Sequence, residues 1–125
     1  MEQNNDAIRR AEAHDERMSR FGKAGLYLVT SHEFSRGRRT LDILRAALAG
    51  GVRLVEVREK SLGDRDLLCL AREARKMTGD AGALMIVNDR VDIALACGAD
   101  GVHLGRGDMP VDAARRMAPG LVIGA

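Results

Sequence analysis

Four charged side chains follow short apolar runs of this chain, at positions where they could hold an anion and a metal ion. Arg58 and Lys60 come just after a run that ends at Val57, and Asp89 and Asp108 come just after the next two runs. An arginine fork can grip two oxygens of a phosphate, and a lysine adds a mobile positive charge. Mg²⁺ binds through one or two carboxylates plus phosphate oxygens. The pattern therefore favours a site for a magnesium-bound diphosphate.

Each of these residues also fits an ordinary structural role. Arg58 and Lys60 would suit a surface cluster of ion pairs with Glu59 and nearby acids. Asp89 is placed to cap a helix that begins at Val91. The occurrence of both carboxylates beyond consecutive strands, with two cations one strand earlier, favours the binding site over these alternatives.

Alternation along an extended chain predicts which of these side chains share a side. Glu56, Arg58 and Lys60 should point together, whereas Val57 and Glu59 should point away from them. We therefore expect the run from Glu56 to Lys60 to form the anion-binding part of the site.

Four further residues have side chains that can do chemistry. Asn88 can both donate and accept hydrogen bonds, which suits the edge of an aminopyrimidine, although an Asn after a strand is also a common turn residue. His103 alternates with apolar neighbours and is expected to point into a barrel interior or pocket as a hydrogen-bonded structural histidine. Cys69 and Cys97 lie in apolar helical patterns, so both are expected to be reduced thiols in the core.

The elements that must position these residues are strands and helices in alternation. Apolar runs predict strands at residues 26–29, 52–57, 84–87, 101–104 and 121–123. Helical spacing predicts helices at residues 41–48, which Thr40 would cap, and at 67–77, 91–97 and 111–117. Such repeats give a parallel sheet whose carboxyl ends meet at one edge, where α/β proteins bind ligands. Because an eight-stranded barrel needs at least about 200 residues, this 125-residue chain is predicted to be half of a TIM (β/α)8 barrel.

Composition sets the remaining expectations. Residues 1–22 carry both signs of charge and predict a helical or frayed extension that Gly22 ends, followed by the partial barrel at 23–125. Lys plus Arg number 20 against 18 for Asp plus Glu, so no nucleic-acid partner is indicated. No segment resembles a membrane span or a secretion signal, which predicts a cytoplasmic protein. Two open sheet edges predict a homo-oligomer.

Four motifs in order resemble the thiamine-phosphate synthase family of TIM barrels, and the resemblance is to the family's N-terminal half only, which implies the N-terminal half of a TIM (β/α)8 barrel. They are LYLVT from Leu26, VEVREK from Val55, the segment from Ile86 to Gly105, and GDMP from Gly107. The resemblance implies an enzyme that joins hydroxymethylpyrimidine diphosphate to a thiazole phosphate, giving thiamine monophosphate and pyrophosphate with Mg²⁺. It further implies that Arg58 and Lys60 hold the diphosphate, that Asn88 contacts the pyrimidine, and that Asp89 and Asp108 hold the metal.

The chain departs from the family pattern in three places. Glu56 stands where the family usually has Gln, and Arg106-Gly107 replaces a common Gln-Glu or Gln-Asp pair. The motifs of the second half of the family's barrel are absent. A thiazole tautomerase shares the fold but tends to lack the HLGxxDM pattern found here. A non-catalytic half-barrel that binds a phosphate ligand or associates with itself is the other alternative.

Overall fold

Five parallel strands form one sheet in which every strand pairs with its neighbour in the sequence. The computed structural model describes residues 2–125. The strand order is β1-β2-β3-β4-β5. The strands are β1 (Leu28–Val29), β2 (Leu54–Val57), β3 (Leu84–Asn88), β4 (Gly101–His103) and β5 (Val122–Gly124). This sequential parallel order is the arrangement of a partial (β/α) barrel, so the predicted fold class is confirmed.

The first two strands are shorter than predicted. β1 begins at Leu28 rather than Leu26, and β2 begins at Leu54 rather than Val52. The Leu26 amide donates to the Ala24 carbonyl and the Val52 amide to the Ala47 carbonyl, so both residues belong to turns that lead into the strands. Apolar composition alone does not distinguish such a lead-in from the strand itself.

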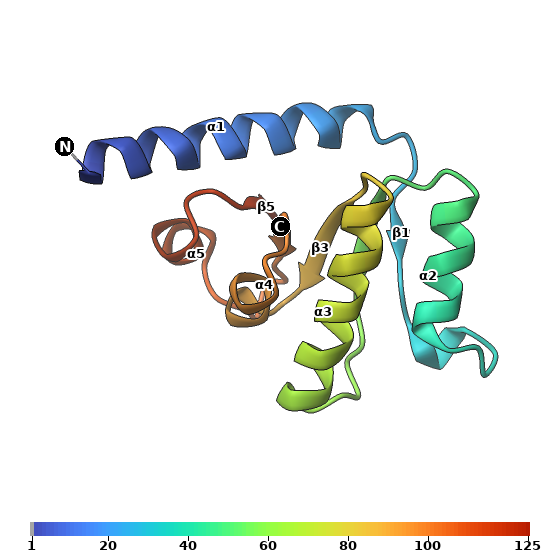
Figure 1. Ribbon diagram of the computed structural model, residues 1–125. Helices are drawn as coiled ribbons and strands as arrows, with labels where there is room; N and C mark the ends of the chain where they lie inside the picture. The colour runs from blue at the N-terminus through green and yellow to red at the C-terminus, as the bar shows by residue number, and fades with distance from the viewer. Residues whose placement is uncertain (1) are drawn as a thin grey trace.

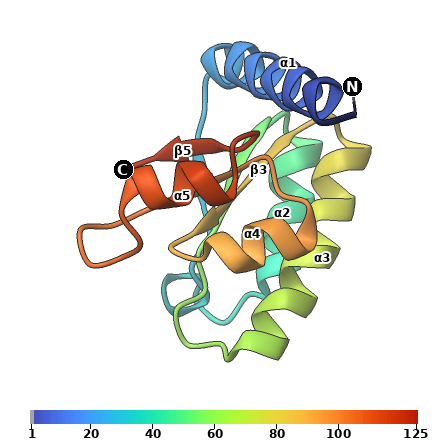
Figure 2. The ribbon, with the colours of Figure 1, turned by 90° about the vertical axis from the view of Figure 1, so that its left-hand side faces the viewer.

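Four helices follow the strands and cover one face of the sheet (Figure 2). They are α2 (Thr40–Ala49), α3 (Asp64–Asp80), α4 (Val91–Cys97) and α5 (Val111–Met117); a short 3-10 helix, η1 (His32–Phe34), lies after β1. The main core lies between these helices and the sheet. Its fully buried members include Leu44, Val55, Met85, Val87 and Val102.

The opposite face of the sheet corresponds to the inside of a barrel and carries a smaller apolar cluster. Leu54, Leu84 and Ile86 are buried there, with Phe21 packed against them. Gly101 also faces this side, because a Cβ atom at this position would lie 2.5 Å from the Val122 carbonyl oxygen and 2.6 Å from the Ile86 Cδ1 atom. Close contact between β4 and β5 therefore depends on the missing side chain at position 101.

A long N-terminal helix, α1 (Glu2–Lys23), lies across the end of the sheet where the strands begin (Figure 1). Arg17 donates to the Gly120 carbonyl at 2.8 Å, and Arg20 donates to the Gly82 carbonyl at 3.0 Å. These carbonyls precede β5 and β3, so the two arginines attach the helix to the sheet. The helix continues through Gly22 to Lys23, and the prediction that Gly22 ends it is wrong.

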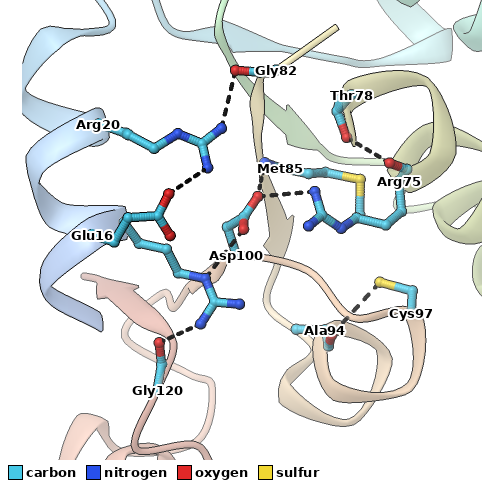
Figure 3. Close-up of polar contacts among 11 residues, drawn as sticks. Glu16, Arg20, Arg75, Thr78, Gly82, Met85, Ala94, Cys97, Asp100 and Gly120 are labelled. Atoms are coloured by element: carbon cyan, nitrogen blue, oxygen red, sulfur yellow. Dashed lines mark hydrogen bonds and ion pairs between the residues drawn. The ribbon is translucent and has the colours of Figure 1, made fainter. Parts of the chain in front are cut away.

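Asp100 joins α1, α3 and the sheet (Figure 3). Its buried carboxylate accepts hydrogen bonds from Arg17 at 3.2 Å, from Arg75 at 3.1 Å and from the Met85 amide at 2.9 Å. The side chain is 4% exposed, so two arginines and a backbone amide compensate for its loss of water.

Two local predictions differ from the structure. Thr40 does not cap α2, because Arg39 occupies the cap position and the Thr40 hydroxyl donates instead to Glu59 at 2.7 Å. Both cysteines are free thiols, but only Cys97 is buried; Cys69 is exposed on α3. The apolar residues of α3 cover more of the helix surface than the part that packs on the core, and Cys69 lies outside that buried part. Across residues 2–125, no helix has the length and apolar character needed to cross a bilayer.

Candidate functional site

A cavity of about 280 Å³ opens beside the carboxyl ends of β2 and β3, and we call it the acidic cavity. Its lining combines three carboxylates with two cations and one amide. The lining residues are Val57, Glu59, Lys60, Leu62, Leu67, Asn88, Asp89, Arg90 and Asp108. The structure therefore brings together Lys60, Asn88, Asp89 and Asp108, as their positions after successive strands predicted.

Asp89 adopts an uncommon backbone conformation at the end of β3. Its φ of 64° lies in the left-handed region, which non-glycine residues seldom occupy. The conformation is held because the Asp89 amide donates to the His103 carbonyl at 2.8 Å and the Arg90 amide donates to the Asn88 carbonyl at 2.7 Å. Asp89 does not cap α4: the cap residue is Arg90, without a capping side-chain bond. Backbone strain at a cavity-lining residue is consistent with a binding role.

Asp108 reaches the same cavity from the loop after β4. The Gly105 amide donates to its Oδ2 atom at 2.7 Å, and the Asp108 amide donates back to the Gly105 carbonyl at 3.1 Å. The pKa of Asp108 is lowered chiefly by the Gly105 amide, then by a hydrogen bond with Asp89 and by the charge of Lys60. Asp108 is therefore ionised at neutral pH, with the Asp89 side chain beside it.

The two cations of the acidic cavity have different partners. The Lys60 ammonium lies 3.2 Å from an Asp89 oxygen, and its side chain is 58% exposed. Arg90 is held by Asp92 and Asp64, each at 2.7 Å. The hydrogen bond that Arg90 donates to Asp92, followed by the one that it donates to Asp64, raises the pKa of Arg90, and the same arginine lowers the pKa of Asp92. Lys60 is thus the more exposed cation of this cavity and has one carboxylate partner, whereas Arg90 has two.

The acidic cavity offers the ligands of a weakly held, hard cation. Among the residues that the structure describes, no group of three or more His, Cys, Asp or Glu side chains could enclose a metal ion. Asp89 and Asp108 nevertheless place two carboxylates side by side. Mg²⁺ commonly uses one or two protein carboxylates and takes its remaining ligands from water and substrate phosphate. The residues present fit such an ion.

Glu56 lies in the barrel interior rather than in the acidic cavity. Its carboxylate is 3% exposed and accepts hydrogen bonds from Tyr27 at 2.7 Å and from Asn88 at 2.9 Å. The His103 Nδ1 atom lies 3.2 Å from the same carboxylate. Burial, and then the hydrogen bond and charge of Glu56, raise the pKa of Tyr27. His103 thus has the hydrogen-bonded interior position predicted for it.

The predicted common side of Glu56, Arg58 and Lys60 is wrong. β2 ends at Val57, and the alternation of a strand does not continue into the loop. Glu56 faces the barrel interior, Lys60 lines the acidic cavity, and Arg58 lines a separate cavity. Val57 is buried in the main core, with part of it reaching the acidic cavity.

The alternative role for Arg58 and Lys60, a surface ion-pair cluster with Glu59 and nearby acids, holds only for Lys60, which pairs with Asp89. Glu59 is buried and accepts hydrogen bonds from the Thr40 hydroxyl at 2.7 Å and the His32 amide at 2.9 Å. Within residues 2–125, no ion pair joins Glu59 to either cation. Glu59 therefore fixes the start of α2 and the loop after β1.

Sequence reasoning missed one interior residue and one loop residue. Tyr27 belongs to an apolar run, and alternation with Leu28 is the signal that places it on the face of Glu56. Arg38 belongs to a loop rich in arginine, and the cavity that it shares with Arg58 depends on how that loop folds back. No periodic signal marks such a contact.

The sequential parallel sheet, with charged residues gathered beyond its strand ends, defines a partial α/β barrel, a class of fold whose ligand sites usually lie at the carboxyl edge of the sheet. The sequence profile described as thiamine monophosphate synthase matches residues 26–125. The chain belongs to this family.

Individual relatives show how much of the family's length is present. The thiamine-phosphate synthase of Methanoculleus marisnigri is 54% identical over 101 residues, covering 80% of this chain and 48% of the relative. The thiamine-phosphate synthase of Albidiferax ferrireducens is 47% identical over 107 residues, covering 86% of this chain and 48% of the relative. The solved thiamine phosphate pyrophosphorylase from Pyrococcus furiosus superposes with a TM-score of 0.76 at 39% identity, covering 82% of this chain and 50% of that one. The chain spans about half the length of the curated relatives that it matches.

Proposed function

We propose that this chain carries the pyrimidine-diphosphate half of a thiamine-phosphate synthase site. The reaction would join hydroxymethylpyrimidine diphosphate to a thiazole phosphate, forming thiamine monophosphate and releasing pyrophosphate. The observation that carries the proposal is the acidic cavity, in which Lys60, Asn88, Asp89 and Asp108 meet at the carboxyl edge of the sheet. Family membership supports the same assignment.

The proposed roles follow from the charges of the cavity. Asp89 and Asp108 would hold Mg²⁺, which would stabilise the negative charge of the departing diphosphate. Lys60 would exchange its contact with Asp89 for a phosphate oxygen, and Arg58 would hold the diphosphate from the adjoining cavity. Loss of the diphosphate leaves a pyrimidine carbocation, which the thiazole nitrogen captures. Electrostatic stabilisation of the leaving group needs no nucleophilic side chain.

Asn88 is oriented for the pyrimidine by Glu56. Its Nδ2 group donates to Glu56 at 2.9 Å, which leaves the Oδ1 atom as the acceptor for a substrate amino group. Glu56 would thus act on the pyrimidine through Asn88, because its own oxygens already accept from Tyr27 and Asn88 and contact His103. This replaces the sequence-based prediction of a direct substrate contact by Glu56.

Calorimetric titration with the pyrimidine diphosphate, followed by a turnover assay with the thiazole phosphate, tests the proposal. Binding should require Mg²⁺ and should be lost in Asp89→Ala. The matched control is Asp112→Ala, which removes an exposed carboxylate paired with Arg116 on α5. Turnover by the chain alone is expected to be absent, because the relatives are about twice its length. Equal binding by Asp89→Ala and Asp112→Ala would contradict the assignment.

A self-associating half-barrel is the second candidate, and the sheet edges favour it. β1 and β5 lie at the two ends of the sheet, and Tyr27 and Val29 expose 41% and 46% of their surfaces. Unpaired edge strands are templates for pairing with another chain. Two copies of the chain would cover these edges. Sedimentation at micromolar concentration should therefore show dimers or larger species, and a monodisperse monomer would argue against this candidate.

A further inference from the structure

A second cavity, of about 390 Å³, lies between the loop after β1 and the end of β2, and we call it the arginine cavity. It is lined by Val29, Thr30, Ser31, Phe34, Ser35, Arg38, Ile43 and Arg58. Both of its charged lining residues are arginines, whereas the acidic cavity has three carboxylates. Its two guanidinium groups are donors suited to an anion.

The loop is built so that Arg38 returns to the sheet. Arg36 and Gly37 have φ values of 55° and 79°, so two successive left-handed residues reverse the chain just before Arg38. The buried Ser35 hydroxyl lies 2.7 Å from the His32 carbonyl oxygen and 2.8 Å from that of Arg38. The Arg38 Nε group donates to the Ser35 carbonyl at 3.0 Å. The loop therefore fixes the base of this guanidinium group and leaves its terminal nitrogens for a ligand.

Arg58 is fixed through its backbone. Its amide donates to the Thr30 hydroxyl at 3.1 Å, and the Thr30 amide donates to the Glu56 carbonyl at 2.9 Å. Thr30 is 3% exposed, so this link between β1 and the end of β2 is shielded from water. The backbone of Arg58 is therefore held in place beside the cavity that its side chain lines.

The carboxylates nearest in sequence are turned toward other partners. Glu56 accepts from Tyr27 and Asn88, and Glu59 accepts from the start of α2 and from the loop after β1. In the described chain, neither Arg38 nor Arg58 takes part in an ion pair. Two arginine side chains that line one cavity and have no carboxylate partner are available to bind an anion.

We propose that Arg38 and Arg58 together bind one phosphate group in the arginine cavity, which makes Arg38 a binding residue of this chain. The ligand class is a phosphate monoester or the terminal phosphoryl group of a diphosphate. The identity of the natural phosphate ligand rests on the proposed function. The binding of phosphate in the arginine cavity does not, because it needs neither Mg²⁺ nor the acidic cavity.

Isothermal titration of the full chain with inorganic phosphate and with pyrophosphate, in EDTA at constant ionic strength, tests this inference. Arg38→Gln and Arg58→Gln should each weaken phosphate binding about tenfold or more, the loss expected for a charge-assisted contact. Arg36→Gln is the matched control, since Arg36 belongs to the same loop but not to the cavity lining, and it should stay within about twofold. Circular dichroism confirms that each variant is folded.

Comparison of the affinities for inorganic phosphate and for pyrophosphate shows whether the natural ligand is a phosphate monoester or a diphosphate. A monoester site should bind both anions similarly. A diphosphate site should prefer pyrophosphate, and Lys60→Gln should reduce that preference. Either pattern supports the cavity as a phosphate site, whereas equal affinities of Arg38→Gln and Arg36→Gln, or no phosphate binding by the parent chain, would overturn it. Because no Mg²⁺ or pyrimidine is present, failure here is distinguishable from loss of the Asp89-dependent binding described above.

Discussion

The Tyr27 hydroxyl donates a 2.7 Å hydrogen bond to the Glu56 carboxylate, and so ties the lead-in to β1 to the interior face of β2. Tyr27 as a whole is 41% exposed, but its hydroxyl lies against a buried carboxylate. An ionised phenol at this position would lose its donated hydrogen bond and face a negative charge. Protonated Tyr27 is therefore part of the folded structure.

Titration of Tyr27 should occur above its ordinary pH range. Burial, and then Glu56, raise the pKa of Tyr27, so the folded chain should show little tyrosinate absorbance near pH 10, where an unperturbed tyrosine is half ionised. Because the folded pKa exceeds the unfolded one, this contribution to stability is present below about pH 10 and declines as the pH rises further. The chain has one Tyr and no Trp, so ultraviolet absorbance reports this group directly. A half-point near pH 10 without unfolding would contradict the prediction, and the urea-unfolded chain supplies the reference.

Asp108 should remain ionised at a lower pH than an ordinary aspartate. The Gly105 amide, then Asp89 and Lys60, lower its pKa. Carboxyl carbon shifts measured by NMR should place the Asp108 midpoint below about 3.9. Lys60→Gln should move that midpoint upward, because it removes a positive charge, whereas Lys76→Gln on α3 should leave it unchanged. An unchanged midpoint in Lys60→Gln would show that this lysine does not act on the acidic cavity.

Asp100→Asn should strongly destabilise the fold. The substitution removes the charge that Arg17 and Arg75 share, and loss of one partner from a buried ion pair costs about 3 kcal/mol or more. Asp112→Asn breaks an exposed pair with Arg116 and should cost below about 1 kcal/mol. Urea unfolding monitored by circular dichroism compares the free energies of unfolding. Equal losses in the two variants would show that the attachment of α1 to the sheet contributes little.

Gly101→Ala should separate β5 from β4. The added Cβ atom would meet the Val122 carbonyl oxygen at 2.5 Å, and backbone cannot move as easily as a flexible side chain. We expect a loss of about 1–3 kcal/mol in the free energy of unfolding, as for other overpacked sites. Gly79→Ala is the matched control, because a Cβ atom added at Gly79 in helix α3 would have nothing within 4 Å, and it should stabilise the chain by about 0.5–1 kcal/mol. Equal stability of both variants would contradict the close approach at Gly101.

Much of the fold was predictable because its signals are local. Runs of apolar residues separated by helical spacing indicate the order of all five strands, and parallel pairing places Asn88, Asp89 and Asp108 at one edge. Strand alternation holds only as far as Val57, and its extension beyond that residue misplaces Arg58 relative to Lys60. The error has a physical cause, since backbone geometry changes where a strand becomes a loop.

The contacts that could not be predicted join residues far apart in the chain. The bond from Tyr27 to Glu56 spans 29 positions, and that from Lys60 to Asp89 spans another 29. Alternation can place Tyr27 on the face of Glu56, but the pairing of these particular side chains depends on three-dimensional packing. The metal, substrate and catalytic roles of the site residues remain predictions that the experiments above address.

The anchoring of α1 constrains how the chain can be made in the cell. Arg17 bonds to Gly120, 103 positions later, so part of the surface that holds this helix is synthesised well after the helix itself. Before β5 is translated, the helix can contact only the part of the sheet already made, such as β2 and β3 through Phe21 and Arg20, and contacts of long sequence separation slow folding. Helix α1 therefore docks completely only after β5 has been made, and its exposure to chaperones and proteases during translation depends on the time needed to complete that strand.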